Sequence, residues 1–180
     1  MEIQIEKGSE AFFREFVSLQ FQGRHLIKDP ERKFKDMFKS SRNTLILCII
    51  LLIWQTAMLK FNGPKTFLYI LIGCTVMLFI MIIFSFFIMN KNLKTFLAKN
   101  APSTLSLSAE GIENTTNEGE KVAIPWSKIA YIRIFKEMMA FMPHDISGII
   151  IGLDSKYAPQ IMDWITQNNI NIRFIAGEKK

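Results

Sequence analysis

The chain is poor in the residue types that most often carry chemistry. Its 180 residues include only 2 cysteines, 2 histidines and 9 glycines. Cys48 and Cys74 have no other cysteine or histidine close in sequence, so the spacing of metal-binding motifs is absent. His25 and His144 have no nucleophile or metal partner at a recognisable spacing, and no glycine-rich phosphate loop is present. We therefore expect no catalytic residue, no metal site and no cofactor, and a protein that is not an enzyme.

Charge is missing from two long stretches. Residues 44–59 (TLILCIILLIWQTAML) and 66–89 (TFLYILIGCTVMLFIMIIFSFFIM) contain no Lys, Arg, Asp, Glu or His. A helix needs about 20 mainly apolar residues to cross a bilayer, and a soluble surface helix carries a polar stripe that both stretches lack. The remaining residues are too few to bury two such helices. The sequence therefore predicts two membrane spans, at about 43–61 and 66–89, joined by a turn at KFNGPK (60–65).

Positive charge is distributed unevenly along the chain. Residues 1–100 carry 14 Lys and Arg against 7 Asp and Glu, whereas residues 101–180 carry 8 against 9. The C-terminal part therefore lacks the basic surface of a nucleic-acid-binding domain, and we expect no nucleic-acid partner. Most basic residues near the spans lie before the first or after the second, which predicts a cell-membrane protein with both termini in the cytoplasm.

A basic segment directly precedes the first span. Pro30 is expected to open a helix over about 31–42 that continues into the span. Its apolar face would include Phe34 and Phe38. The residues expected to contact an anionic membrane surface are Arg32, Lys33, Lys35, Lys39 and Arg42. The same charges would also serve simply to orient the hairpin, and the sequence leaves both interpretations open.

The remaining segments predict a mixture of short strands and helices. MEIQIE (1–6) alternates as a strand does, and Ser9 is a suitable N-cap for a helix over about 10–22. From residue 103 onward the pattern indicates five or six short strands and one helix beginning near Ala158. The predicted fold class is α+β: a transmembrane helical hairpin, an N-terminal strand and helix segment, and a small antiparallel-sheet domain closed by a helix.

The expected organisation has three parts. Residues 1–42 form a cytoplasmic strand and amphipathic helices, residues 43–90 form the transmembrane hairpin, and residues 91–180 form a cytoplasmic helix extension followed by the sheet domain.

Two motifs, L-x-L-S-x-E-G-I and IPWSKIAYI, carry a resemblance to a known family. The matching residues are Leu105, Leu107, Ser108, Glu110, Gly111, Ile112, Ile124, Pro125, Trp126, Ser127, Ile129 and Ile132. Together with the layout of the chain they resemble the YcxB-like family of small bacterial membrane proteins, which implies a pleckstrin-homology-like (PH-like) C-terminal domain. That family has no established enzymatic activity. The C-terminal INIRFIAGEKK departs from its pattern and leaves the closure of the sheet open.

These features favour a non-enzymatic, membrane-anchored binding or adaptor protein that presents its cytoplasmic domain to a protein or peptide. The alternative is an immunity protein that protects the cell against a bacteriocin or toxin. The expected partners are the lipid bilayer and an unidentified protein, and a homo-oligomer stays possible. Trp126 is a candidate partner contact, although a tryptophan at such a position more often fills the core.

Overall fold

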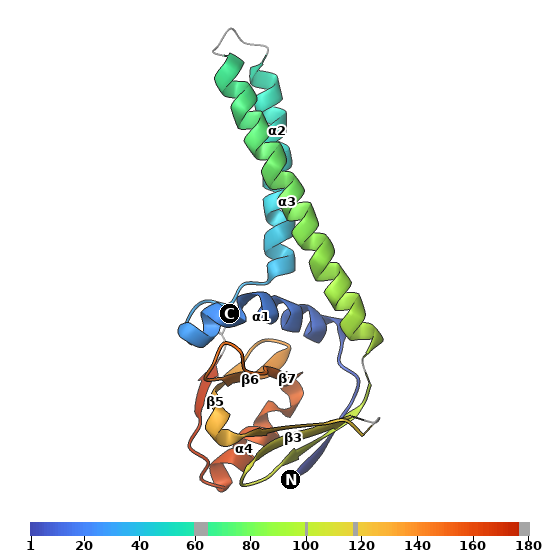
Figure 1. The fold of residues 1–180 in the computed structure, drawn as a ribbon, viewed down its shortest axis with the longest axis vertical. Helices are drawn as coiled ribbons and strands as arrows, with labels where there is room; N and C mark the ends of the chain where they lie inside the picture. The colour runs from blue at the N-terminus through green and yellow to red at the C-terminus, as the bar shows by residue number, and fades with distance from the viewer. Residues whose placement is uncertain (60–64, 100, 117–118, 177–180) are drawn as a thin grey trace. The chain divides into compact units, whose positions relative to one another are not determined.

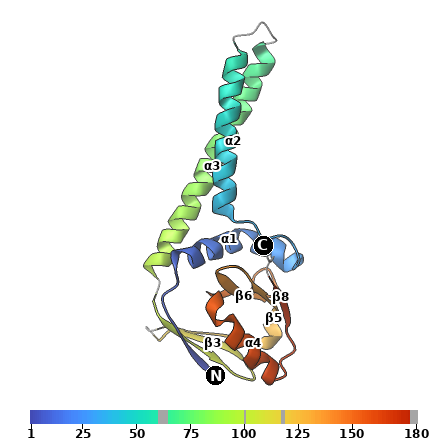
Figure 2. The ribbon, with the colours of Figure 1, turned by 180° about the vertical axis from the view of Figure 1, so that it is seen from behind.

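The computed structural model describes residues 1–59, 65–99, 101–116 and 119–176. The chain forms two compact units (Figures 1 and 2). The sheet unit consists of Met1–Phe34 and Thr95–Lys180, and the hairpin unit consists of Lys35–Lys94. The expected turn after the first span, at residues 60–64, and most of the tip expected at residues 117–119 lie outside the described residues.

The sheet unit contains two four-stranded sheets. The first has the antiparallel order β1-β2-β3-β4, with the strands β1 (Glu2–Ile5), β2 (Ser103–Leu107), β3 (Gly111–Thr116) and β4 (Lys121–Pro125). The N-terminal strand predicted from alternation is therefore an edge strand of this sheet. It pairs with β2 so that Ile3 lies opposite Leu105, and both side chains are buried.

The second sheet has the order β7-β6-β5-β8. Its strands are β5 (Ile129–Ile134), β6 (Met138–Pro143), β7 (Ile151–Asp154) and β8 (Arg173–Ala176). The β5–β8 pair is parallel, and the other pairs are antiparallel. Short 3-10 turns, η1 (Trp126–Lys128) and η2 (Ser155–Tyr157), precede β5 and helix α4 (Ala158–Gln167).

Helices cover both faces of the second sheet. The main core contains Leu105, Ile132 and Phe141, and α4 adds Ile161 and Ile165 to it. Helix α1 (Glu10–Lys28) lies on the opposite face. Ser9 is its N-cap, and the Ser9 hydroxyl accepts a hydrogen bond from the Phe12 amide. A second cluster joins α1 to β5 and β6; its buried members are Phe12, Leu19, Leu26, Tyr131, Phe135, Met138, Ala140 and Met142.

One predicted helix is wrong. Residues 29–36 form turns and irregular backbone, and α2 begins only at Met37. Tertiary contacts hold this segment: the buried Arg133 guanidinium donates to the carbonyl oxygens of Pro30 and Arg32, each at 2.8 Å. Phe34 packs on Phe135 with ring centroids 4.6 Å apart. These contacts use the carbonyl groups of a turn and a bend, which a continuous helix from Pro30 would not present in this way.

The hairpin unit is built from α2 (Met37–Met58) and most of α3 (Lys65–Ala98). Both helices are long and apolar enough to cross a membrane. In the most apolar stretch of 18 residues, only 11% of the residues of α2 and 6% of those of α3 are buried. The pair is held together by Phe38 against Phe86 and by a hydrogen bond of 3.0 Å from Gln55 Nε2 to Thr75 Oγ1. The model thus confirms the α+β fold class with a hairpin of two long apolar helices.

Candidate binding surface

The β4 strand has an open backbone edge. The amides of Thr116 and Trp126 donate to the carbonyls of Glu120 and Glu110, at 2.9 and 3.1 Å. Because hydrogen-bonded pairs alternate in an antiparallel ladder, the backbone of every second β4 residue points toward β3. The register leaves Ala123 facing the other way, at the outer edge of the sheet. Its N–H and C=O are therefore available to another extended chain.

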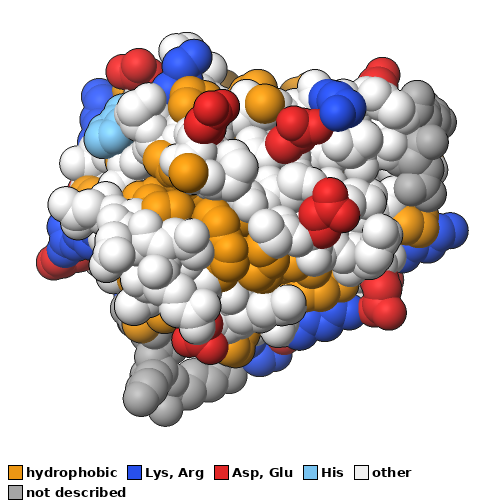
Figure 3. Space-filling view, turned by 90° about the horizontal axis from the view of Figure 1, so that it is seen from below, with side chains coloured by type: hydrophobic (Ala, Val, Ile, Leu, Met, Phe, Trp, Pro, Cys, Tyr) orange, Lys and Arg blue, Asp and Glu red, His pale blue; other side chains and the backbone are white. Residues whose placement is uncertain are grey.

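A mainly apolar hollow of about 390 Å³, which Lys128 and Asp145 also line, lies beside this edge. Its apolar lining includes Ala123, Ile129, Phe141 and Ile149, and Ile149 is 61% exposed. Figure 3 shows that apolar side chains form a band across one face of the sheet unit, with charged side chains of both signs around it. An open strand edge next to an apolar hollow combines backbone pairing with a side-chain pocket, the arrangement used to recognise extended peptides.

Trp126 lies where β4 ends, at the rim of the main core. Its indole Nε1 donates to the Ser108 carbonyl at 2.8 Å, and its ring stacks on Trp164 with centroids 6.4 Å apart. The side chain is half-buried and packs against the core cluster. Trp126 therefore connects the β2–β3 turn to α4, and its use as a partner contact stays a prediction.

The five basic residues expected at the membrane surface are divided between two structural contexts. Arg32, Lys33 and Lys35 lie in the irregular segment, whereas Lys39 and Arg42 lie in the first turns of α2. All five are exposed. Lys39 is also part of the helix start, because its amide donates to the Asp36 carboxylate at 3.1 Å. They do not form the continuous basic helix predicted from the sequence, and their contact with lipid stays a prediction.

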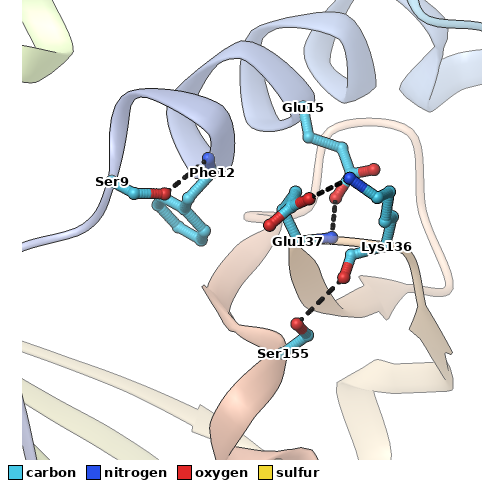
Figure 4. A network of polar contacts seen from close by, with 6 residues as sticks. All are labelled: Ser9, Phe12, Glu15, Lys136, Glu137 and Ser155. Atoms are coloured by element: carbon cyan, nitrogen blue, oxygen red, sulfur yellow. Dashed lines mark hydrogen bonds and ion pairs between the residues drawn. The ribbon is translucent and has the colours of Figure 1, made fainter.

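A network of polar contacts joins α1 and η2 to the β5–β6 turn of the sheet unit (Figure 4). The Glu15 carboxylate on α1 accepts a hydrogen bond of 2.8 Å from the Glu137 amide in the β5–β6 turn. The Ser155 hydroxyl donates to the Lys136 carbonyl of the same turn at 3.0 Å. Burial raises the pKa of Glu15, although the Glu137 amide acts in the opposite direction. The contacts connect α1 and η2 to this turn.

Among the described residues, no group of three or more His, Cys, Asp or Glu side chains could hold a metal ion. Sequence reasoning missed Arg133 and the hollow beside β4. Arg133 interrupts the apolar run IAYIRIF, which was a signal for a buried arginine with specific partners. The hollow gave no such signal, because Ile149 lies in the loop before β7, in an apolar run that does not by itself show where the strand begins.

The geometry defines a small α+β sheet unit with an open strand edge, attached to two apolar helices of membrane-spanning length. No family model, curated protein or solved structure matches the chain.

Proposed function

We propose that the protein is a non-enzymatic, membrane-anchored binding protein whose sheet unit captures a protein partner through an extended segment. The hairpin places the sheet unit at the cytoplasmic surface of the cell membrane, with both termini inside. The partner segment pairs with the outer edge of β4 at Ala123 and inserts an apolar side chain between Phe141 and Ile149.

The open β4 edge beside the apolar hollow is the observation that carries this proposal. The edge supplies backbone donors and acceptors that any extended chain satisfies, and the hollow supplies selectivity for an apolar side chain. Natural edge strands are often protected by lysine or proline. Lys121 and Pro125 stand at the two ends of β4 and leave Ala123 open between them.

The sequence resemblance to the YcxB-like family supports the same proposal. It implies a bacterial membrane protein with a PH-like domain and without a known catalytic activity. The distribution of basic residues around the two apolar helices supports the cytoplasmic placement of the sheet unit.

The test compares partner capture by the full-length chain, solubilised in detergent, with capture by an edge variant. Ala123→Pro removes the outward N–H and does not break a β3–β4 hydrogen bond, so the sheet tolerates it. We expect the proteins crosslinked to and co-purified with the wild-type chain to be lost from Ala123→Pro. Gln4→Pro is the matched control, because Gln4 lies on β1, at the opposite edge of the same sheet.

A partner retained by Ala123→Pro and lost from Gln4→Pro would contradict the β4 assignment. Substitution of Lys60 and Lys65 distinguishes the proposed binding function from the alternative, an immunity function. If these changes abolish protection against a toxin while Ala123→Pro has no effect, the protein acts as an immunity protein.

A further inference from the structure

The loop between β6 and β7 separates two hollows of the sheet unit. One is the hollow beside β4. The other is a shallow hollow between this loop and the end of α1, lined by Arg24, Ile27, Lys28, His144, Asp145, Ile146 and Ser147. Ile146 is 44% exposed and lies in an exposed loop, residues 144–149. Ile27 and Ile146 therefore place apolar surface next to the basic side chains of Arg24 and Lys28.

The loop has a defined shape that presents Ile146 outward. The His144 amide donates to the Lys128 carbonyl at 3.1 Å, and the Gly148 amide donates to the Asp145 carbonyl at 2.9 Å. Gly148 packs so closely that an added Cβ would lie 2.4 Å from the Pro143 Cβ. The position of Ile146 is therefore built into the fold.

The charges around this hollow are mainly positive. Arg24 and Lys28 are four residues apart on α1, so their side chains share one face of the helix. Both are exposed and form no ion pair within the described part of the chain. His144 adds an imidazole side chain, and Asp145 is the one acidic residue in the lining. The combination suits a negatively charged group that has apolar material beside it.

The residues that line this hollow at the end of α1 are close in sequence to the first apolar helix. Phe34 is fixed to the sheet unit by Phe135, and only Lys35 and Asp36 separate it from Met37, where α2 begins. Three residues of extended chain span about 10 Å. Residues 29–36 alone connect Lys28, the last residue of α1, to Met37, so the hollow is separated from the first apolar helix by a short stretch of sequence.

We infer that this hollow is a second membrane contact, which binds the phosphate of an anionic lipid headgroup. Arg24 and Lys28 pair with the phosphate, while Ile27 and Ile146 enter the apolar zone beneath the headgroups. The inference rests on the membrane anchoring proposed above. It adds a lipid-dependent orientation of the sheet unit, which leaves the β4 edge on the other side of the loop available for a partner.

The test uses the full-length chain reconstituted into vesicles, in a background of Cys48→Ala and Cys74→Ala. An environment-sensitive fluorophore is attached to Ile146→Cys. We expect a blue-shifted emission, quenched by nitroxide-labelled lipid, in vesicles that contain phosphatidylglycerol, and a water-like emission in pure phosphatidylcholine. Arg24→Gln and Lys28→Gln should each lower the ratio of lipid-contacting to water-exposed probe about fivefold, because a basic residue near an anionic surface contributes about 1 kcal/mol.

Matched controls separate this contact from a general surface effect. The same fluorophore on Gln167→Cys, an exposed position at the end of α4, should stay in water in both vesicle types. Lys7→Gln, an exposed basic position outside the hollow, should leave the Ile146→Cys signal unchanged.

Four results would overturn the inference. A probe that stays in water in anionic vesicles excludes the contact. A signal that rises with the protein-to-lipid ratio assigns Ile146 to a contact with protein instead. A signal that is equal in pure phosphatidylcholine shows that no anionic headgroup is bound. If alkaline carbonate extracts the chain from the vesicles, both this inference and the proposed membrane anchoring are wrong. If the chain stays inserted but the probe is exposed to water, only this inference is wrong.

Discussion

Tyr131 connects α1 to the second sheet through one buried polar contact. Its hydroxyl donates to the Leu26 carbonyl at 2.7 Å, inside the cluster that joins the helix to β5 and β6. Burial raises the pKa of Tyr131 to about 12; the nearby Arg133 lowers it and Asp29 raises it. The unfolded chain loses this proton near pH 10. The folded state therefore holds the proton more tightly, and this contribution to stability is lost as the pH rises from about 10 through 12.

We expect Tyr131→Phe to lower the free energy of unfolding by about 1 kcal/mol at neutral pH, because it removes one hydrogen bond and leaves the Leu26 carbonyl buried. The variant should also lose part of the alkaline decrease in stability that the wild type shows between pH 10 and 12. The measurement is thermal unfolding of the detergent-solubilised chain, followed by circular dichroism across this range. Tyr157→Phe is the control, since the Tyr157 hydroxyl makes only exposed hydrogen bonds. If the stability of Tyr131→Phe falls between pH 10 and 12 as much as that of the wild type, the assignment of this decrease to Tyr131 is wrong.

Among the elements, the two apolar helices share one buried polar contact, between Gln55 and Thr75. Gln55 is 5% exposed, and its Oε1 atom is buried without a hydrogen-bond partner among the described residues. Thr75 also donates to its own helix, at the Leu71 carbonyl. The pair therefore fixes the register of α2 against α3 at a modest net gain in stability.

We expect Gln55→Leu to weaken the pairing of α2 and α3 by about 0.6–2 kcal/mol, the range measured for hydrogen bonds between membrane helices. The measurement is unfolding of the hairpin in mixed micelles as the fraction of denaturing detergent increases. Thr56→Val is the matched control, because the Thr56 hydroxyl bonds only to the Leu52 and Ile53 carbonyls of its own helix. Equal midpoints for Gln55→Leu and Thr56→Val would show that the interhelical bond contributes nothing.

At the scale of the whole molecule, the proposed orientation of the hairpin in a membrane can be tested directly. Basic residues are concentrated around the start of α2 and the end of α3, and by the positive-inside rule this distribution supports the proposed cytoplasmic position of the sheet unit. We expect a membrane-impermeant maleimide to label Asn62→Cys in intact cells, in the background without Cys48 and Cys74. Asn171→Cys, in the sheet unit, should react only after the cells are permeabilised. The reverse pattern of labelling would invert the topology and remove the sheet unit from cytoplasmic partners.

Several features followed from the sequence because they depend on local patterns. Two long stretches of uncharged, apolar residues predicted the two long helices, and alternation of apolar and polar residues predicted β2 and the N-terminal strand. Ser9 was predicted as the N-cap of α1 because a serine hydroxyl at this position accepts a hydrogen bond from a backbone amide within the next three residues. In the structure that amide belongs to Phe12.

Other features depend on contacts between distant parts of the chain. β1 pairs with β2 across about 100 residues, and Arg133 binds the backbone at Pro30 and Arg32 across a similar separation. The open edge of β4 and the hollow beside Ile146 likewise exist only because strand order and loop packing bring separate segments together.

The sequence alone determined the two apolar helices and the mixture of strands and helices, because hydrophobic periodicity reports the surroundings of each residue along its own element. Tertiary structure alone decided that residues 29–36 are not helical and that β8 runs parallel to β5. It also decided which strand edge stays open. The physical reason is that these choices depend on long-range hydrogen bonds and side-chain packing, which compete with local propensity and override it.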